Sequence, residues 1–511
     1  MNAGAAAANL LWLARGRGAA RRFAAALDRP RDAQAQWLFH QVRLHARSEY
    51  GRAHDFSAID SIAEFRRRVP LASPGDVAPW VARIRRGEPD VLTCDLVTHL
   101  VPTSGTTGAR KLVPFSRGLQ QGFDAAIAAW MRDLARLRPR ILWGPAYWSV
   151  TPLAADDIGG DDQGTPAGSV RIGFADDADY LGGAATWLVR RVMAAPSSLR
   201  HERDPETFWH RTLAALLARR DLRLLSIWHP SFLDLLIAAA RRQWAAVLDG
   251  LETSRARELA HIGPEDWPRW WPDLQVVSCW GDQAAAPGHR ALQARLPHVL
   301  VQAKGLLATE AVVTVPYAGA HVLAVTSHHF EFLDEAGGVH GADALARGGR
   351  YEVVVTNGGG LWRYRLGDVV ECTGHVGGTP ALRFLGRAGR SSDLRGEKLS
   401  EPFVAEVLRS VWPAALPAYL ALRAWDGATS AGYELLVSAD DLPRASADLA
   451  GRLDDALAAN PHYAVARRLG QLSPPRVVAV ARDHGAASLA ATTGRLGDVK
   501  PEVLIPAGAG R

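Results

Sequence analysis

The chain has 511 residues, with 48% apolar and 22% charged side chains, a formal net charge of +6 and a pI near 9.4. This composition is typical of a globular protein and argues against extended disorder. The length predicts more than one domain. Arginines are spread along the chain without a block of five basic residues. We therefore expect solvated faces and no nucleic-acid partner.

The cysteines and the apolar segments bear on the cellular compartment. Cys94, Cys279 and Cys372 lie far apart and form no CxxC or Cys/His spacing, which predicts neither a disulfide framework nor a structural zinc. No apolar run approaches 18 residues, so no membrane span is expected. The Ala/Leu-rich start of the chain predicts an amphipathic helix rather than a signal peptide. We expect a monomeric cytoplasmic protein without a membrane partner.

In the first half of the chain, helical and strand patterns alternate. Residues 5–50 and 117–137 have apolar positions at helical spacing. Between them, Thr98–Val101 and Lys111–Phe115 have strand character and enclose a Ser/Gly/Thr loop that we expect to be exposed. Asp204-Pro-Glu-Thr predicts a helix start with a capping aspartate.

The middle of the chain predicts two kinds of sheet. The short apolar runs Leu222–Trp228, Leu274–Cys279 and Val299–Gln302 alternate with helical segments, which favours mixed or parallel sheets with covering helices. Residues 310–390 have the character of β-hairpins, and an Asn357-Gly-Gly-Gly turn lies between two of the strands.

A polar, glycine-rich stretch near Arg390–Arg395 separates these hairpins from a compact α+β segment. We therefore predict an α/β protein with a large N-terminal domain, residues 1–392, and a small mobile C-terminal domain, residues 393–511. The large domain is expected to bind the substrates, and the small one to act as a lid.

The strongest local motif is Thr103-Ser-Gly-Thr-Thr-Gly-Ala-Arg-Lys111. Its glycines allow close approach of backbone N–H groups to an anion, its hydroxyls donate further hydrogen bonds, and Lys111 supplies positive charge. The motif is not a Walker A loop, because Ala-Arg-Lys follows the second glycine and a strand follows in turn. We interpret Ser104, Gly105, Thr106, Thr107, Gly108 and Lys111 as a phosphate-binding loop rather than an ordinary turn.

Other candidate residues follow predicted strands. Glu310 is either a solvated acid at a strand end or a Mg²⁺ ligand, and one such carboxylate suffices because Mg²⁺ is held by one or two carboxylates and substrate phosphates. Trp280-Gly281-Asp282 follows a strand at the end where ligands of open α/β sheets gather, although a simple turn is the alternative. Asp368 follows Gly367 at a predicted strand turn, where a turn-forming aspartate is the alternative to a site residue. Arg363 and Arg365 are expected to share one face of a strand.

Only four of the 59 basic residues are lysines: Lys111, Lys304, Lys398 and Lys500. Each lies in a stretch that contains glycine. Lysine is a compact point charge that arginine rarely replaces at a binding site, so these four positions are candidates for site residues. Lys304 could be a second anion contact, but no role is assigned to it. The adjacent pair His328-His329 is expected to point to opposite faces of a strand and not to hold a metal.

The phosphate-binding motif resembles that of the adenylate-forming superfamily, which activates carboxylates with ATP. More narrowly, the chain resembles the auxin-responsive promoter family of acyl acid amido synthetases, the auxin- and jasmonate-conjugating enzymes of plants and their bacterial relatives. Further segments match in order: Leu307-Ala-Thr-Glu310, Leu361-Trp-Arg-Tyr-Arg-Leu-Gly-Asp368, Gly386–Asp393, Gly396–Glu401 and Lys500. Two departures are the bulky Leu307 and the Pro501 that directly follows Lys500.

The resemblance implies a role for each matched residue. Glu310, with Thr309, would contact the metal and phosphate, and Asp368 would hold the ribose hydroxyls of ATP. Trp280, Gly281 and Asp282 would lie near the adenine, and Arg387 would belong to the hinge and contact phosphate. Lys500 would be the catalytic lysine of the mobile domain.

The expected activity is that of an ATP- and Mg²⁺-dependent acyl acid amido synthetase. Such an enzyme adenylates a small carboxylic acid and transfers the acyl group to an amine, here expected to be an amino acid. Two alternatives stay open: an acyl-CoA ligase or another enzyme with a thiol acceptor, and a non-catalytic nucleotide-binding protein. The identities of the acid and of the acceptor do not follow from the sequence.

Overall fold

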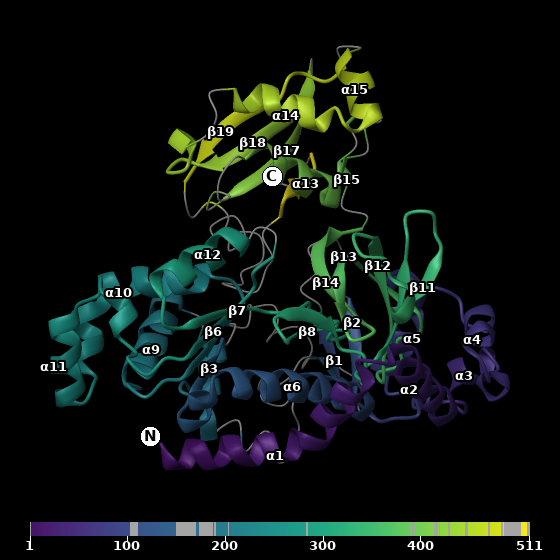
Figure 1. The fold of residues 1–511 in the computed structure, drawn as a ribbon, viewed down its shortest axis with the longest axis horizontal. Coiled ribbons are helices and arrows are strands. Elements are labelled where there is room, and N and C mark those ends of the chain that lie inside the picture. Colours follow the sequence, from purple (N-terminus) through teal and green to yellow (C-terminus); the bar gives the residue numbers. More distant parts are fainter. Residues whose placement is uncertain are drawn as a thin grey trace.

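A computed structural model describes residues 2–102, 111–149, 170–172, 188, 191–202, 204–282, 285–388, 391–392, 394–395, 397, 399–412, 417, 419–427, 430–444, 448–468, 471–481, 484 and 502–507. Within these ranges the chain forms mixed sheets with helices around them, and a smaller α+β part stands apart from the rest (Figure 1). The predicted fold class is confirmed.

The parallel sheet consists of four strands in the order β3-β5-β6-β7. Their bounds are Ala146–Trp148 (β3), Leu224–Ser226 (β5), Val276–Cys279 (β6) and Leu300–Ala303 (β7). Helices α9 (Pro205–Leu217), α10 (Ser231–Asp249), α11 (Thr253–Ile262) and α12 (Ala286–Arg295) lie on this side of the molecule (Figure 1). The carboxyl ends of all four strands meet at one edge, which is where ligands of such sheets bind.

A second sheet has seven strands in the order β11-β10-β12-β13-β14-β9-β8, and every pairing in it is antiparallel. The strands are β8 (Thr314–Tyr317), β9 (Ala320–Leu323), β10 (His329–Leu333), β11 (Val339–Gly341), β12 (Arg350–Thr356), β13 (Tyr364–Val376) and β14 (Thr379–Arg387). Helices α2 (Pro30–Leu44), α3 (Glu49–Ala53), α4 (Ile62–Arg68) and α5 (Pro74–Arg85) lie on its outer side in Figure 1.

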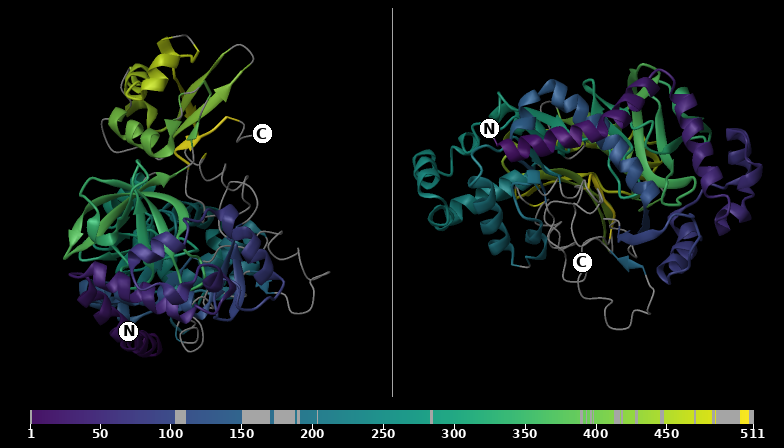
Figure 2. Two further views of the ribbon diagram at one scale, coloured as in Figure 1. Left: turned by 90° about the vertical axis from the view of Figure 1, so that its right-hand side faces the viewer. Right: turned by 90° about the horizontal axis from the view of Figure 1, so that it is seen from below.

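A long helix connects the two sheets. Helix α6 (Arg117–Leu137) follows the hairpin of β1 (Val97–Pro102) and β2 (Leu112–Ser116), and β4 (Arg171–Ile172) extends this small sheet. Helix α1 (Ala3–Ala26) packs along α6 and crosses the lower face of the molecule (Figure 2). Asn9, on α1, anchors it because its side-chain amide donates to the carbonyls of Leu142 and Gly144, both at 3.1 Å.

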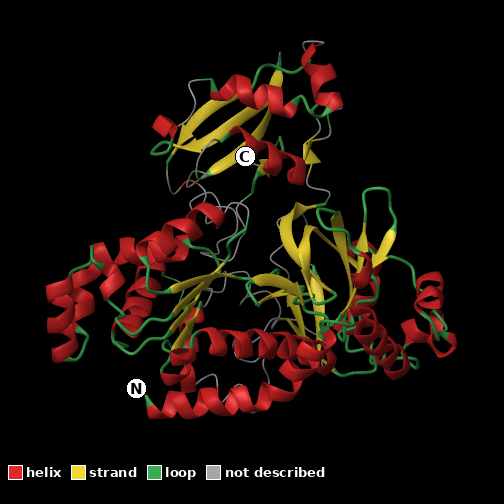
Figure 3. Cartoon of the chain, viewed as in Figure 1, coloured by secondary structure: helices red, strands yellow, loops and turns green. Residues whose placement is uncertain are grey.

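The C-terminal part has its own hydrophobic core, which runs from Leu399 to Leu504. Its four-stranded sheet has the order β19-β18-β17-β20, with helices beside it (Figure 3). The elements are α13 (Glu401–Val411), β17 (Leu420–Asp426), β18 (Ala431–Ser438), α14 (Leu449–Leu457), α15 (Pro461–Arg468), β19 (Arg476–Val480) and β20 (Leu504–Ile505), preceded by the small pair β15 (Ser391–Ser392) and β16 (Leu399–Ser400). The domain boundary near residue 392 stays a prediction.

Several predicted elements are confirmed and some are corrected. The helix at 117–137 has the predicted bounds, and Asp204 caps α9 by accepting from the backbone N–H of Thr207 at 2.8 Å. In contrast, Asp368 does not lie at a strand turn but inside β13. The strand continues through Gly367, which has φ 75°, instead of ending there. All three cysteines are free, and no helix in the described part of the chain could cross a membrane.

Candidate functional site

Two neighbouring strands pair an aspartate with an arginine. Asp368 on β13 and Arg387 at the end of β14 are direct partners across the antiparallel ladder. The guanidinium Nε of Arg387 donates to Oδ1 of Asp368 at 3.2 Å. Asp368 is buried, whereas Arg387 is half-exposed. The negative charge of Asp368, followed by that of Glu310, outweighs burial and raises the pKa of Arg387, so the arginine stays charged.

Glu310 lies in a tight hairpin between β7 and β8. Leu307 and Val312 form an antiparallel bridge, and the backbone N–H of Ala308 donates to the carbonyl of Ala311 at 2.9 Å. The side-chain amide of Asn357 donates to the backbone carbonyl of Glu310 at 2.8 Å. The hairpin therefore holds Glu310 against the Asn357–Gly360 turn, beside the antiparallel sheet.

The surroundings of Glu310 combine burial with charges of both signs. Burial raises the pKa of its carboxyl group, and the neighbouring Asp368 raises it further. Arg387 and Lys111 act in the opposite direction and lower it. The structure thus places Glu310, Asp368, Arg387 and Lys111 within electrostatic reach of one another. Two carboxylates that share a region with two cations form a site suited to a phosphate group with its counter-ion.

Tyr364 completes the wall of this site. It is buried at the start of β13, and burial together with the charge of Glu310 raises the pKa of its phenol, so the hydroxyl keeps its proton. The sequence motif that includes Tyr364 was recognised, but a role for this residue was not predicted.

Glu401, the first residue of α13, connects the two parts of the chain. Its Oε2 accepts from the backbone N–H of Arg387 at 3.2 Å, and its Oε1 accepts from that of Val503 at 3.3 Å. Gly386 has φ 143°, and a Cβ added there would lie 3.5 Å from Glu401 Oε2. Glu401 was also missed as a site residue, although it ends a motif that was quoted for the hinge. Its burial between two backbone segments could not follow from residue type.

The predicted triplet Trp280-Gly281-Asp282 lies at the carboxyl edge of the parallel sheet. The Trp280 ring lies 5.8 Å from that of Trp228, and Asp282 Oδ2 is 3.9 Å from Nδ1 of His321. A Cβ on Gly281 would lie 2.5 Å from Cβ of Ala303, so packing between β6 and β7 already requires glycine there.

The remaining predicted residues divide into two groups. Thr309 is half-buried directly before Glu310, and Lys111 is half-buried at the start of the strand that follows the phosphate-binding motif. The other group lies outside the described residues and consists of Ser104, Gly105, Thr106, Thr107, Gly108, Lys398 and Lys500. The assignments made for these positions stay predictions.

The interpretation of Arg363 and Arg365 as neighbours on one face is wrong. Arg363 precedes β13 with φ 45° and is buried, where its Nε donates to Oε2 of Glu331 at 2.7 Å. Arg365 is exposed and pairs with Glu352 at 2.6 Å. Arg363 therefore stabilises the interior.

Two further features of the structure are a buried pair of histidines and a small cavity. His328 and His329 are buried, and burial lowers the pKa of His328 to about 3 and that of His329 to about 4. Within the described ranges no group of three or more His, Cys, Asp or Glu residues is arranged to hold a metal.

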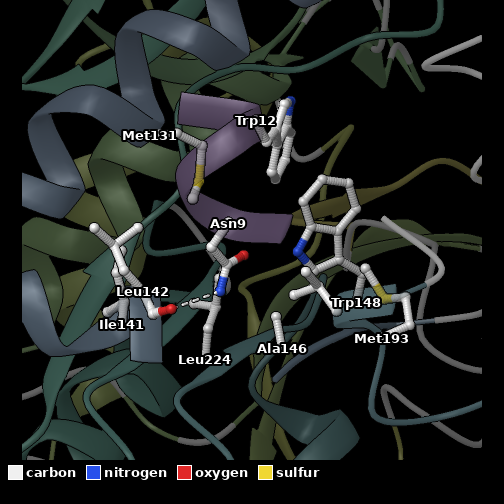
Figure 4. Close-up of a pocket in the computed structure, with 10 residues that line it drawn as sticks. Asn9, Trp12, Met131, Ile141, Leu142, Ala146, Trp148, Met193 and Leu224 are labelled. Carbon is white, nitrogen blue, oxygen red and sulfur yellow. Dashed lines mark hydrogen bonds between the residues drawn. The ribbon is translucent and has the colours of Figure 1, made fainter. Parts of the chain in front are cut away.

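A cavity of about 20 Å³ between α1, α6 and β3 is lined mainly by apolar side chains such as Trp12, Met131 and Trp148 (Figure 4). It is a small packing void.

The fold is that of the adenylate-forming enzymes. An acyl acid amido synthetase solved in complex with 2,4-DB superimposes with a TM-score of 0.79 at 15% identity, covering 96% of this chain and 94% of that one. A 2-hydroxyisobutyryl-CoA ligase superimposes with a TM-score of 0.51 at 14% identity, covering 93% and 88% of the two chains. Similarity at this level of identity establishes the fold alone.

Family comparisons are more specific. The GH3 family N-terminal domain matches residues 19–261, and the GH3 family central domain matches residues 321–387. The chain belongs to the GH3 family, whose amido synthetases are adenylate-forming ligases. It is 24% identical over 449 residues to a probable indole-3-acetic acid-amido synthetase of Oryza sativa subsp. japonica, covering 72% of this chain and 71% of that protein. A jasmonoyl-L-amino acid synthetase of Nicotiana attenuata is 38% identical over 82 residues, 14% of each chain.

Proposed function

We propose that this protein is an ATP-dependent acyl acid amido synthetase that joins a small carboxylic acid to an amino acid or another amine. The observation that carries the proposal is the group formed by Glu310, Asp368, Arg387 and Lys111, because it gathers two carboxylates and two cations on the fold of this family. The named activities of the relatives support the same reaction class.

The reaction has two steps. In the first, a carboxylate oxygen of the acid attacks the α-phosphorus of ATP, a P–O bond forms, and pyrophosphate leaves. In the second, the amine attacks the acyl carbon, the amide bond forms, AMP leaves and the amine loses a proton. The first step depends on positioning and on neutralising phosphate charge, because the carboxylate of the acid must approach the negatively charged phosphates of ATP.

The chain's own residues suit these demands. Asp368, a buried carboxylate braced by Arg387, would accept hydrogen bonds from the ribose hydroxyls of ATP. Lys111 and the Ser104–Gly108 loop would hold its phosphates. Lys500 would neutralise the oxygens at the reacting phosphorus once the C-terminal domain, residues 393–511, closes on residues 1–392. Such a closure is a lid-type step.

Mg²⁺ also fits the residues. Glu310 is a buried carboxylate next to a second one, and their mutual repulsion favours a bound cation. One or two carboxylates with phosphate oxygens are the usual Mg²⁺ ligands, so Glu310 would hold the ion, which supplies charge neutralisation when bound. Trp280, Asp282 and Thr309 would complete the nucleotide surface. A cytoplasmic, monomeric protein remains part of the proposal.

Carboxylate-dependent exchange of labelled pyrophosphate into ATP tests the first step. The screen should use aromatic, fatty and hydroxy acids, and products formed with pooled amino acids should be identified by mass spectrometry. We expect exchange with at least one acid and an amide product. Thioester formed with coenzyme A and no amide would instead identify a ligase with a thiol acceptor. Absence of exchange with every acid would support a non-catalytic nucleotide-binding protein.

A further inference from the structure

Lys304 is the lysine for which the sequence suggested no role, and its surroundings are unusual. It directly follows β7 at the carboxyl edge of the parallel sheet, and its Nζ donates to Oγ of Ser226, at the end of β5, at 2.6 Å. The ammonium group also lies 5.2 Å from the ring centre of Trp228 and 6.0 Å from that of Trp130 on α6.

Among the described residues, the partners recorded for the Lys304 ammonium are neutral: the hydroxyl of Ser226 and the rings of Trp228 and Trp130. No ion pair with a carboxylate is recorded for it within that part of the chain. Burial lowers its pKa to about 8, and the neighbouring titratable group that acts on it is the thiol of Cys279. Burial raises the pKa of that thiol to about 12, so it is neutral below this pH and cannot compensate the ammonium.

A lysine ammonium has three N–H donors, and the hydroxyl of Ser226 accepts one of them. Buried charges in proteins are normally paired, because an unpaired charge outside water is costly. The ammonium group lies near the indole rings of Trp130 and Trp228, and Trp280 extends this aromatic surface because its ring lies 5.8 Å from that of Trp228. The place is therefore suited to a planar apolar body that carries an anionic group.

The same segment of chain connects Lys304 with the proposed reaction centre. Glu310 follows it by six residues, and a fully extended segment of that length spans at most about 21 Å. The hairpin shortens this span, because the backbone N–H of Val313 donates to the carbonyl of Leu306 at 2.9 Å. The chain therefore limits the distance between Glu310 and Lys304, and an acid that reaches both residues must fit within this span.

We propose that Lys304, with Ser226 beside it, binds a second carboxylate of the acyl acid, so that the preferred substrates are dicarboxylic acids with a planar apolar body. One carboxylate is adenylated, and the other lies against Lys304 between Trp130 and Trp228. This inference rests on the proposed function for the identity of the reaction, but the binding of the acid can be measured without it.

The test is calorimetric titration with isophthalate, terephthalate and biphenyl-4,4′-dicarboxylate, each matched to the monoacid in which methyl replaces one carboxylate. We expect at least one dicarboxylate to bind the wild-type protein about tenfold more tightly than its matched monoacid. Lys304→Met should abolish this preference, Lys304→Arg should retain part of it, and Arg21→Met, on the exposed face of α1, should leave it unchanged.

The pH dependence gives an independent check. Both carboxylates of these acids stay ionised between pH 7 and 9.5, so a preference that declines above about pH 8 reports the loss of the proton from Lys304. Equal binding of diacids and monoacids by the wild type would overturn the inference. So would a preference that persists in a folded Lys304→Met protein, or a Lys304→Met defect confined to the acceptor amine. Tight diacid binding without pyrophosphate exchange would contradict the proposed function alone.

Discussion

Arg387 and Asp368 face each other across β13 and β14, and Nε of the arginine donates to Oδ1 of the aspartate at 3.2 Å. The pair brings a carboxylate that is itself buried into contact with a guanidinium that reaches the surface. Among the described residues, Arg387 is the partner recorded for this carboxylate, and it contacts the oxygen Oδ1. This geometry suits recognition of a pair of hydroxyl groups.

Asp368→Asn should raise the KM for ATP by about 10–100-fold, since a hydrogen bond to a charged group contributes about 1.5–3 kcal/mol. The kcat for exchange at saturating ATP should change much less, because the ribose does not react. The KM for the acid serves as the internal control. An unchanged KM for ATP in a folded variant would mean that Asp368 only positions Arg387.

The substitution Glu310→Gln should raise the stability of the protein and abolish its activity. Burial raises the pKa of Glu310, so the folded state binds its proton more tightly than the unfolded state does. The ionised form of Glu310 therefore lowers the free energy of unfolding, and this destabilisation is fully present above the raised pKa. The glutamine variant should have a higher Tm than the wild type at pH 8 and a smaller difference at pH 4.5.

The same variant should lose pyrophosphate exchange, because an amide cannot replace a carboxylate as a Mg²⁺ ligand of comparable strength. Thermal unfolding at the two pH values and exchange assays over a Mg²⁺ series provide the measurement. Exchange at the wild-type rate throughout the series would exclude Glu310 as the metal ligand.

The sequence was sufficient to predict the helices within residues 5–50 and at 117–137 and the start of α9, because apolar periodicity and capping residues mark them, but α4, α5 and α11 were not predicted. It was not sufficient where a single backbone dihedral angle decides the course of a strand. Gly367 and Arg363 have φ of 75° and 45°, and these angles change the course of the chain at β13. For this reason the expected turn at Asp368 and the expected shared face of Arg363 and Arg365 are both wrong. The strand β14, which carries Arg387, was predicted only as part of the hairpin region 310–390 and without bounds of its own.

The candidate site was predictable only as far as motifs identify residues. Glu310, Asp368 and Arg387 were named from three separate segments, and the structure brings them together. No site role was predicted for Asn357 or Glu401, because their roles depend on backbone groups distant in sequence, the carbonyl of Glu310 and the N–H groups of Arg387 and Val503. Contacts of this kind leave no spacing pattern in the sequence.

Arg363→Met should destabilise the protein by at most about 3–5 kcal/mol, because it removes one of the two arginines, Arg363 and Arg66, that each pair with the buried carboxylate of Glu331 at 2.7 Å. Arg365→Met, two residues away, is the matched control. Its pair with Glu352 is half-exposed, so its loss should cost less than about 1 kcal/mol. Urea midpoints of the two variants provide the comparison, and equal midpoints would contradict the assignment of Arg363 to the interior.

Gly281→Ala should destabilise the large domain by about 1–3 kcal/mol, since the new Cβ would lie 2.5 Å from that of Ala303 and force β6 and β7 apart. Gly250→Ala is the control, because its Cβ would have its nearest neighbour at 3.6 Å. If Gly281→Ala keeps its urea midpoint but loses affinity for ATP, the glycine serves the nucleotide rather than the packing of the sheet.

Lys500→Ala should abolish carboxylate-dependent pyrophosphate exchange while leaving the fold intact. The proposed role of Lys500 is to neutralise oxygens at the reacting phosphorus, and alanine removes that charge. Arg476→Ala is the control in the same C-terminal unit, because Arg476 is an exposed cation at the start of β19 that pairs with Glu434 at 3.1 Å. It should retain exchange and the wild-type Tm. Full exchange by Lys500→Ala would mean that another cation, such as Lys111, neutralises the reacting phosphate.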